Sequence, residues 1–265
     1  NVFGFTWSLE GPAGSVVSSQ SFQFSDGLLP DLVAGDYILT VDGSFDATGD
    51  YAFRLLDLAA ATTVTPGTPV SGTLTPSNAT NLYQFTAAAG DQVFFDAQTS
   101  SGGTLYWKLI DPYGTELFYQ GWSDVNTLTL IAPGTYSLLV EGYIFNIADS
   151  ANFTFNLDPI GNVPPVPYTG TPLTLGAATS GDISTAGEID SYIFTLTADD
   201  RLYFDSLSNT ASLTWSLDGP GGRMVDASAI NFDGIQNGSL LDVPAGDYRL
   251  ELAGMATATG AYAFR

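Results

Sequence analysis

Apolar and polar residues alternate with a period of two along most of the chain, and no window supports the 3.6-residue period of a helix. The apolar runs are short, rich in aromatic and β-branched residues, and bounded by turns of Gly, Pro, Asn and Asp. Examples are LYQF (82–85), QVFF (92–95), LYWKLI (105–110), YSLLVEG (136–142) and NFTFNL (152–157). This pattern predicts an all-β chain whose antiparallel strands form two-sheet, jelly-roll-like β-sandwiches.

The chain repeats its own phrases. Residues 1–14 read NVFGFTWSLEGPAG and residues 209–222 read NTASLTWSLDGPGG, with eight of fourteen letters identical. Residues 31–54 match residues 242–265 at 14 of 24 positions. A middle copy of the same phrase surrounds Trp107, which lies 100 residues after Trp7 and 108 before Trp215. The sequence therefore predicts tandem repeats of about 100 residues.

The first half of the repeat occurs twice, at 71–97 and at 180–206, which are 109 positions apart. We therefore expect four parts. They are the C-terminal half of a repeat (1–57), a complete repeat (58–159), a proline-rich linker (160–169) and a nearly complete repeat (170–265). We name the three repeats the half repeat, the middle repeat and the third repeat.

Half a sandwich exposes apolar faces and unpaired strand edges. We expect residues 1–57 to be completed by strands that the half repeat itself lacks. These would come from more of the same polypeptide or from a neighbouring molecule that donates a strand.

Charge narrows the possible functions. The chain has 28 Asp and Glu against six Lys and Arg, a formal charge of -22, and neither His nor Cys. Nucleic acid and anionic membranes are polyanions, so neither is an expected partner, and no run of 18 apolar residues predicts membrane insertion. Without His or Cys the usual nucleophilic triads and zinc sites are excluded. Paired carboxylates for glycoside hydrolysis need a cleft that small sandwiches rarely offer, so we expect no enzyme activity.

Oxygen ligands without His or Cys suit Ca²⁺. The densest acidic cluster consists of Asp182, Glu188 and Asp190 in the third repeat, and it is the candidate calcium site. The matching stretch of the middle repeat carries Asn78 and Asn81 instead of acids. The alternative interpretation is a solvated negative surface.

Aromatic residues at matching points of the repeats are expected to be structural. Trp7, Trp107 and Trp215 are predicted core residues, and the Gly-Asp-Tyr or Gly-Thr-Tyr turns place a tyrosine at the corner of each sandwich. Trp122 has no tryptophan counterpart in the other repeats and stands beside a turn. It is the candidate ligand-binding residue, and the alternative is again packing.

The order of these motifs resembles the bacterial pre-peptidase C-terminal domain. The residues that carry the resemblance are SGTL (71–74), LYQF or SYIF, AAGDQVFFD, the DPYG turn (111–114) and APGTYSLLVEG (132–142). Glu188 and Asp190 match the acids that often precede the Tyr-x-Phe strand of that family. The resemblance covers essentially the whole chain, and it implies a β-sandwich module that is secreted or exposed at the cell surface.

These observations favour a non-catalytic extracellular array, either structural or adhesive, that forms a stalk, fibre or filament segment of a larger protein. Its expected partners are neighbouring repeats of the same or another molecule, and a polysaccharide or other surface target. The alternative function is a substrate- or polysaccharide-binding accessory module of a secreted hydrolase.

Overall fold

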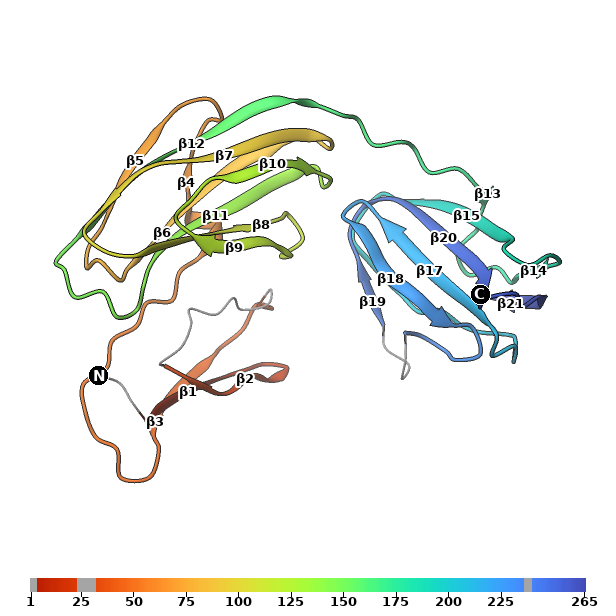
Figure 1. Ribbon diagram of the computed structural model, residues 1–265. Coiled ribbons are helices and arrows are strands. Elements are labelled where there is room, and N and C mark those ends of the chain that lie inside the picture. The colour runs from red at the N-terminus through yellow and green to blue at the C-terminus, as the bar shows by residue number, and fades with distance from the viewer. Residues whose placement is uncertain (1–3, 23–31, 236–239) are drawn as a thin grey trace. The chain divides into compact units, whose positions relative to one another are not determined.

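The computed structural model describes residues 4–22, 32–235 and 240–265, and these residues form β-strands joined by turns (Figure 1). Residues 1–3 of the repeated opening phrase and residues 23–31 of the half repeat lie outside them. Within the described residues the one helical element is the short 3-10 turn η1 (Leu58–Ala60), and no helix is long and apolar enough to cross a membrane. The predicted all-β antiparallel sandwich fold is confirmed.

The half repeat forms a single sheet. Its described strands are β1 (Phe5–Gly11), β2 (Gly14–Ser21) and β3 (Ile38–Gly43). They are ordered β2-β1-β3, so β3 is an edge strand whose described neighbour is β1.

The middle repeat forms two sheets. Its strands are β4 (Thr62–Thr63), β5 (Val70–Leu74), β6 (Thr80–Ala87), β7 (Asp91–Ser101), β8 (Leu105–Ile110), β9 (Glu116–Gly121), β10 (Val125–Leu130), β11 (Gly134–Gly142) and β12 (Ala151–Asn162). One sheet has the order β4-β6-β11-β8-β9, and the other has the order β10-β7-β12-β5. The inward side chains of alternate positions, including Trp107 and Phe155, are fully buried, which is the pattern expected of a sandwich core.

The third repeat has the same order of strands along the chain, and three of its strands are shorter than their counterparts in the middle repeat. Its strands are β13 (Thr171–Pro172), β14 (Thr179–Ile183), β15 (Ile189–Leu196), β16 (Asp200–Leu202), β17 (Leu213–Gly219), β18 (Gly222–Ala229), β19 (Leu241–Val243), β20 (Gly246–Gly254) and β21 (Gly260–Phe264). The sheet β13-β15-β20-β17-β18 matches the five-stranded sheet of the middle repeat. The strands that match its other sheet form two separate pairs, β14-β21 and β16-β19.

Register is the same in all three repeats. Trp7, Trp107 and Trp215 stand opposite Val41, Val140 and Leu252 respectively. The hairpin β1-β2 shares a bulge with β17-β18, because Ser19 and Ala227 both adopt positive φ, 49° and 47°. Repeated letters therefore produce repeated backbone geometry.

Several side chains are less buried in the half repeat than at the equivalent positions of the other two repeats. Trp107 and Trp215 are 0% and 1% exposed, whereas Trp7 is only half-buried, and the side chains of β3 are exposed or half-buried along its length. The described residues of the half repeat supply one sheet and no second sheet, so among its described apolar side chains Phe5 and Leu9 are buried and the rest are half-buried or exposed.

By contacts the chain divides into two compact bodies, which are described separately. One comprises residues 1–85, 94–126 and 135–158, and the other comprises 86–93, 127–134 and 159–265. The predicted linker begins inside β12, which continues to Asn162. Its Tyr168 donates a hydrogen bond of 3.0 Å to the Gly219 carbonyl, and the Arg249 guanidinium lies 5.3 Å from the centre of the Tyr168 ring. The end of the linker is thus attached to the third repeat, while the predicted repeat boundaries stay a prediction.

Candidate functional site

Within the acidic cluster of the third repeat, Glu188 makes its hydrogen bonds inside its own turn. The Glu188 carboxylate accepts hydrogen bonds from the backbone N–H groups of Ser184 (2.7 Å) and Thr185 (2.9 Å) and from both hydroxyls. These bonds, the Ser184 hydroxyl first, hold the pKa of Glu188 below its ordinary value, because they favour the charged form. Glu188 therefore closes the turn between β14 and β15.

Asp190 has a partner from the far end of the repeat. Its carboxylate accepts a short hydrogen bond from the Tyr262 hydroxyl, which also lies 2.7 Å from the Tyr192 hydroxyl. Burial and these two hydrogen bonds raise the pKa of Tyr262, so the phenol stays protonated. The chain of groups Tyr192, Tyr262 and Asp190 ties β15 to β21.

Asp182 lies on β14 and is exposed. The part of the chain that the structure describes contains no group of three or more Asp, Glu, His or Cys arranged to hold a metal ion. Two of the three predicted ligands are engaged by the turn and by Tyr262, and calcium binding stays a prediction.

Trp122 packs within an aromatic cluster. Its ring centroid lies 5.0 Å from that of Trp107 and 5.5 Å from that of Phe153, and its side chain is half-buried. This environment resembles the edge of a core more than an exposed platform. Ligand binding by Trp122 stays a prediction.

The middle repeat carries an exposed row of aromatic rings that the sequence analysis did not single out. Tyr106 stacks on Tyr119 at 5.6 Å, lies 6.1 Å from Tyr143, and Tyr143 in turn lies 5.3 Å from Phe145. Tyr119, Tyr143 and Phe145 are each exposed to solvent, Tyr119 by 50%. Such a row offers flat apolar faces with hydroxyl edges, which suit the stacking of sugar rings.

The only lysine of the chain anchors this row. The Lys108 ammonium lies 4.7 Å from the centre of the Tyr119 ring and 3.7 Å from carboxylate oxygens of Glu116 and Glu141. Lys108 and Glu141 are both buried, so their ion pair holds the Lys108 ammonium in place against the Tyr119 ring. The sequence carried one signal for this row. In both LYWKLI and LFYQG, tyrosine occupies a position whose side chain faces out of the sandwich.

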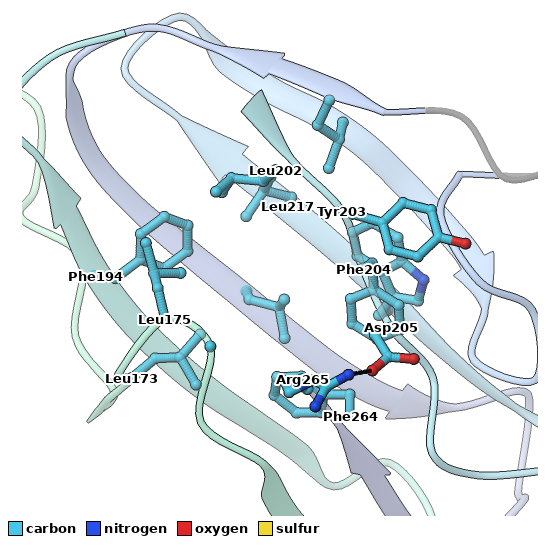
Figure 2. Close-up of a pocket in the computed structure, with 14 residues that line it drawn as sticks. Leu173, Leu175, Phe194, Leu202, Tyr203, Phe204, Asp205, Leu217, Phe264 and Arg265 are labelled. Atoms are coloured by element: carbon cyan, nitrogen blue, oxygen red, sulfur yellow. Dashed lines mark ion pairs between the residues drawn. The ribbon is translucent and has the colours of Figure 1, made fainter. Parts of the chain in front are cut away.

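The third repeat contains an apolar cavity of about 390 Å³ (Figure 2). In Figure 2, Leu173, Leu175 and Phe194 lie on one side of the cavity and Phe204 and Phe264 on the other. An ion pair of 2.8 Å between Arg265 and Asp205 stands at its margin. The wall is almost wholly hydrocarbon, so the cavity suits an apolar side chain and offers little to a charged ligand.

A second hollow, lined by residues 71–73, 99–101 and 152–154 of the middle repeat, is mostly polar. Its hydroxyl and amide groups bond one another, as in the contacts Thr73–Asn152 (2.8 Å) and Ser71–Thr154 (3.1 Å). These side chains satisfy each other across β5 and β12, and they present no preformed set of donors to a ligand.

The chain was compared with known proteins. No family model and no curated protein matches it. Several solved structures are similar to it, and two of them are named here. One is a turret protein of Sulfolobus turreted icosahedral virus, 10% identical with a TM-score of 0.21 over 75% of this chain and 96% of that chain. The other is the CUB1-EGF-CUB2 region of human MASP-1/3, 8% identical with a TM-score of 0.21 over 74% and 98%. Likeness at this level carries no argument about function, which must rest on the residues described above.

Proposed function

We propose that the chain is a non-catalytic structural or adhesive segment of an extracellular repeat array. The observation that carries this proposal is the recurrence of one sheet geometry along the chain, in which Trp7, Trp107 and Trp215 hold the same register. Sandwich units that recur in this way can be joined in series into an extended array. The resemblance of the sequence to secreted sandwich modules supports the extracellular location.

The distribution of charge supports the same role. Five of the six basic residues form ion pairs with one or more carboxylates. They are Lys108, Arg201, Arg223, Arg249 and Arg265. The rest of the 28 acidic residues give the surface a negative potential. A high net charge keeps extended assemblies soluble and limits indiscriminate association.

Particle shape tests the proposal. Small-angle X-ray scattering of the chain and negative-stain electron microscopy of longer tandem versions should show an extended string whose length grows with the number of repeats. A compact globule of constant length would contradict the structural role.

The exposed aromatic row supports a second candidate function, a polysaccharide-binding accessory module. Tyr106, Tyr119, Tyr143 and Phe145 form a ladder on one repeat, and the third repeat has Thr214 where the middle repeat has Tyr106. A ligand-specific row is expected to differ between repeats, whereas core residues recur.

Retention on insoluble polysaccharides tests this candidate. Tyr119→Ala should reduce retention about fivefold if sugar rings stack on the row, since one aromatic stack is worth about 1 kcal/mol. Tyr113→Ala, on a turn of the same repeat, is the matched control and should leave retention unchanged. Failure of the unmodified chain to bind any polymer would contradict the second candidate.

A further inference from the structure

Four aromatic side chains form a row on the outward side of one sheet of the middle repeat. Tyr119 lies on β9, Tyr106 on the neighbouring strand β8, and Tyr143 and Phe145 in the turn that follows β11. We call these four residues the aromatic row. Successive ring centroids along it are 5.6, 6.1 and 5.3 Å apart, so the row is continuous from the edge strand of the sheet to the turn.

The turn that carries two of these rings is fixed by one side chain. The Asn146 carboxamide accepts a hydrogen bond of 3.1 Å from the Thr104 N–H and donates to the Thr104 carbonyl at 2.9 Å. It also donates to the Ser77 carbonyl at 3.0 Å. The other two rings stand on paired strands. The row is therefore positioned before a ligand arrives, which lowers the entropy cost of binding.

The other two repeats keep this backbone but not these side chains. The same turn hydrogen bond, from an N–H to the carbonyl three residues upstream, measures 2.8 Å at Asn146, 3.1 Å at Ala47 and 3.0 Å at Ala258. The tryptophans also recur in one register. The positions of Tyr106, Tyr143 and Phe145 are occupied by Thr6, Ser44 and Asp46 in the half repeat and by Thr214, Met255 and Thr257 in the third repeat. The fold therefore does not require the row.

At the fourth position the middle repeat differs in its backbone as well. Ser19 and Ala227, the counterparts of Tyr119, lie in a bulge and adopt positive φ, which large side chains rarely do. β9 has no bulge at this point, so Tyr119 stands directly opposite Lys108 of β8. Side chains of directly opposite residues project from the same face of a sheet. A regular edge strand thus places the most exposed ring of the row above the lysine.

The lysine beneath Tyr119 also occurs in this repeat alone. Ser8 and Ser216 occupy the position of Lys108 in the other two repeats. The ion pair of Lys108 and Glu141 is buried, and such a pair returns little net stability because both charges lose their water. Stability alone therefore does not explain the pair. Its ammonium lies 4.7 Å from the centre of the Tyr119 ring, so the pair supports the row from below.

The same charges determine the class of ligand that suits the row. The Lys108 ammonium lies 3.7 Å from carboxylate oxygens of both Glu116 and Glu141, and two carboxylates against one ammonium leave the group negative. The formal charge of the whole chain is -22. An acidic polysaccharide would be repelled here, and a cationic one would be attracted to acidic surface anywhere on the chain. An uncharged polymer would be selected by the rings themselves, through their apolar faces.

We infer that the aromatic row binds an uncharged polysaccharide, and that one polymer chain contacts several rings of the row at once. The inference deepens the second candidate function, on which it rests. Because the rings follow one another without a gap, an oligosaccharide gains contacts as it lengthens until it spans the row. Because the contacts are apolar, binding should not depend on salt.

Length dependence tests the inference. The 265-residue chain is titrated calorimetrically with cello-, xylo- and manno-oligosaccharides, from disaccharide to hexasaccharide. In at least one series the affinity should rise about fivefold with each sugar ring that reaches another aromatic side chain, and it should level off once the row is spanned. The affinities should be the same at low and high NaCl concentration.

A variant at the end of the row identifies the surface. Phe145→Ala should weaken binding of the hexasaccharide about fivefold and leave the disaccharide unchanged, since short ligands still reach the remaining rings. A general loss of structure would instead weaken both equally. Tyr113→Ala, outside the row, is the matched control and should leave both affinities unchanged.

An affinity that does not depend on length would overturn the inference, as would a Phe145→Ala chain that binds the hexasaccharide as tightly as the unmodified chain. Retention on insoluble elastin, with none on uncharged polysaccharides, would overturn it too. Binding to alginate or chitosan but to no uncharged polymer defeats this inference and leaves the second candidate function standing. A chain that binds no polysaccharide contradicts both.

Discussion

Single hydroxyl groups hold the corners of the sandwiches. The Tyr37 hydroxyl donates to the Val33 carbonyl at 2.6 Å, and the Tyr248 hydroxyl donates to the Pro244 carbonyl, four residues upstream in both cases. The predicted tyrosine corner is thus present in the half repeat and in the third repeat. The two differ in burial, because Tyr248 is fully buried and stacks on Phe194 at 5.0 Å, whereas Tyr37 is half-buried.

Removing this hydroxyl should cost more in the buried copy. Tyr248→Phe keeps the stacked ring but leaves a carbonyl without its donor, so the third repeat should lose about 1 kcal/mol of stability. Amide hydrogen exchange of β20 measures the loss locally. Tyr37→Phe is the matched control, with a smaller expected effect because water can replace the hydroxyl. Equal losses at both corners would contradict the role of burial.

The stability of the turn between β14 and β15 is expected to depend on pH through Glu188. Its folded-state pKa is depressed by hydrogen bonds, so its contribution to stability is present above the ordinary carboxyl pKa and is lost as pH falls through the folded value. The difference in stability between the unmodified chain and Glu188→Gln should therefore shrink between pH 6 and pH 2. Thermal unfolding across that range measures it, and a difference that grew at low pH would reverse the sign argued here.

Calcium is the second test of the same residues. If Asp182, Glu188 and Asp190 bind the ion, a concentration 100 times the dissociation constant should stabilise the third repeat by about 2.7 kcal/mol. Melting in CaCl₂ should then exceed melting in NaCl of equal ionic strength, and Asp182→Asn should remove the excess. Identical curves in the two salts would leave a solvated negative surface.

At the scale of elements, the sequence predicts the strands well and their partners less well. Alternation and turn residues indicate each strand, and repeated letters predict that Trp107 and Trp215 share one register. Alternation does not reveal which side chains of different sheets meet when 72 residues separate them, as with Asp190 and Tyr262. It also does not predict that Trp122 packs on Trp107, because no repeat offers a counterpart for comparison.

Equivalent leucines on equivalent strands should differ in their contribution to stability. Leu138 on β11 is fully buried, whereas Leu39 at the same position of β3 is half-buried. Leu138→Ala should cost about 2–5 kcal/mol through lost burial and a cavity. Leu39→Ala should cost about 1 kcal/mol or less, because among the described residues of the half repeat β3 has no second sheet to pack against. Hydrogen exchange of β11 and β3 compares the two variants, and equal costs would show that the half repeat is covered in solution.

At the scale of the whole molecule, the described residues form two sandwiches and the separate sheet β2-β1-β3, and the prediction that residues 1–57 are half of a repeat stays a prediction. What the sequence could not predict is the apolar cavity of the third repeat, because alternation shows which side chains face the core but not how closely they pack there.

The half repeat should make the chain susceptible to a single early cut by trypsin. Arg54 is the first Lys or Arg along the chain, and the Arg54–Leu55 bond lies in an exposed stretch outside any strand. Lys108, Arg201, Arg223 and Arg249 all lie within strands, where a protease must first unfold the sheet.

Timed digestion followed by mass spectrometry should therefore yield residues 1–54 and 55–265 before any other product. Arg54→Gln should abolish the early cut and leave the later ones unchanged, whereas early cleavage at Arg201 or Arg223 would mean that the third repeat opens more easily than the half repeat.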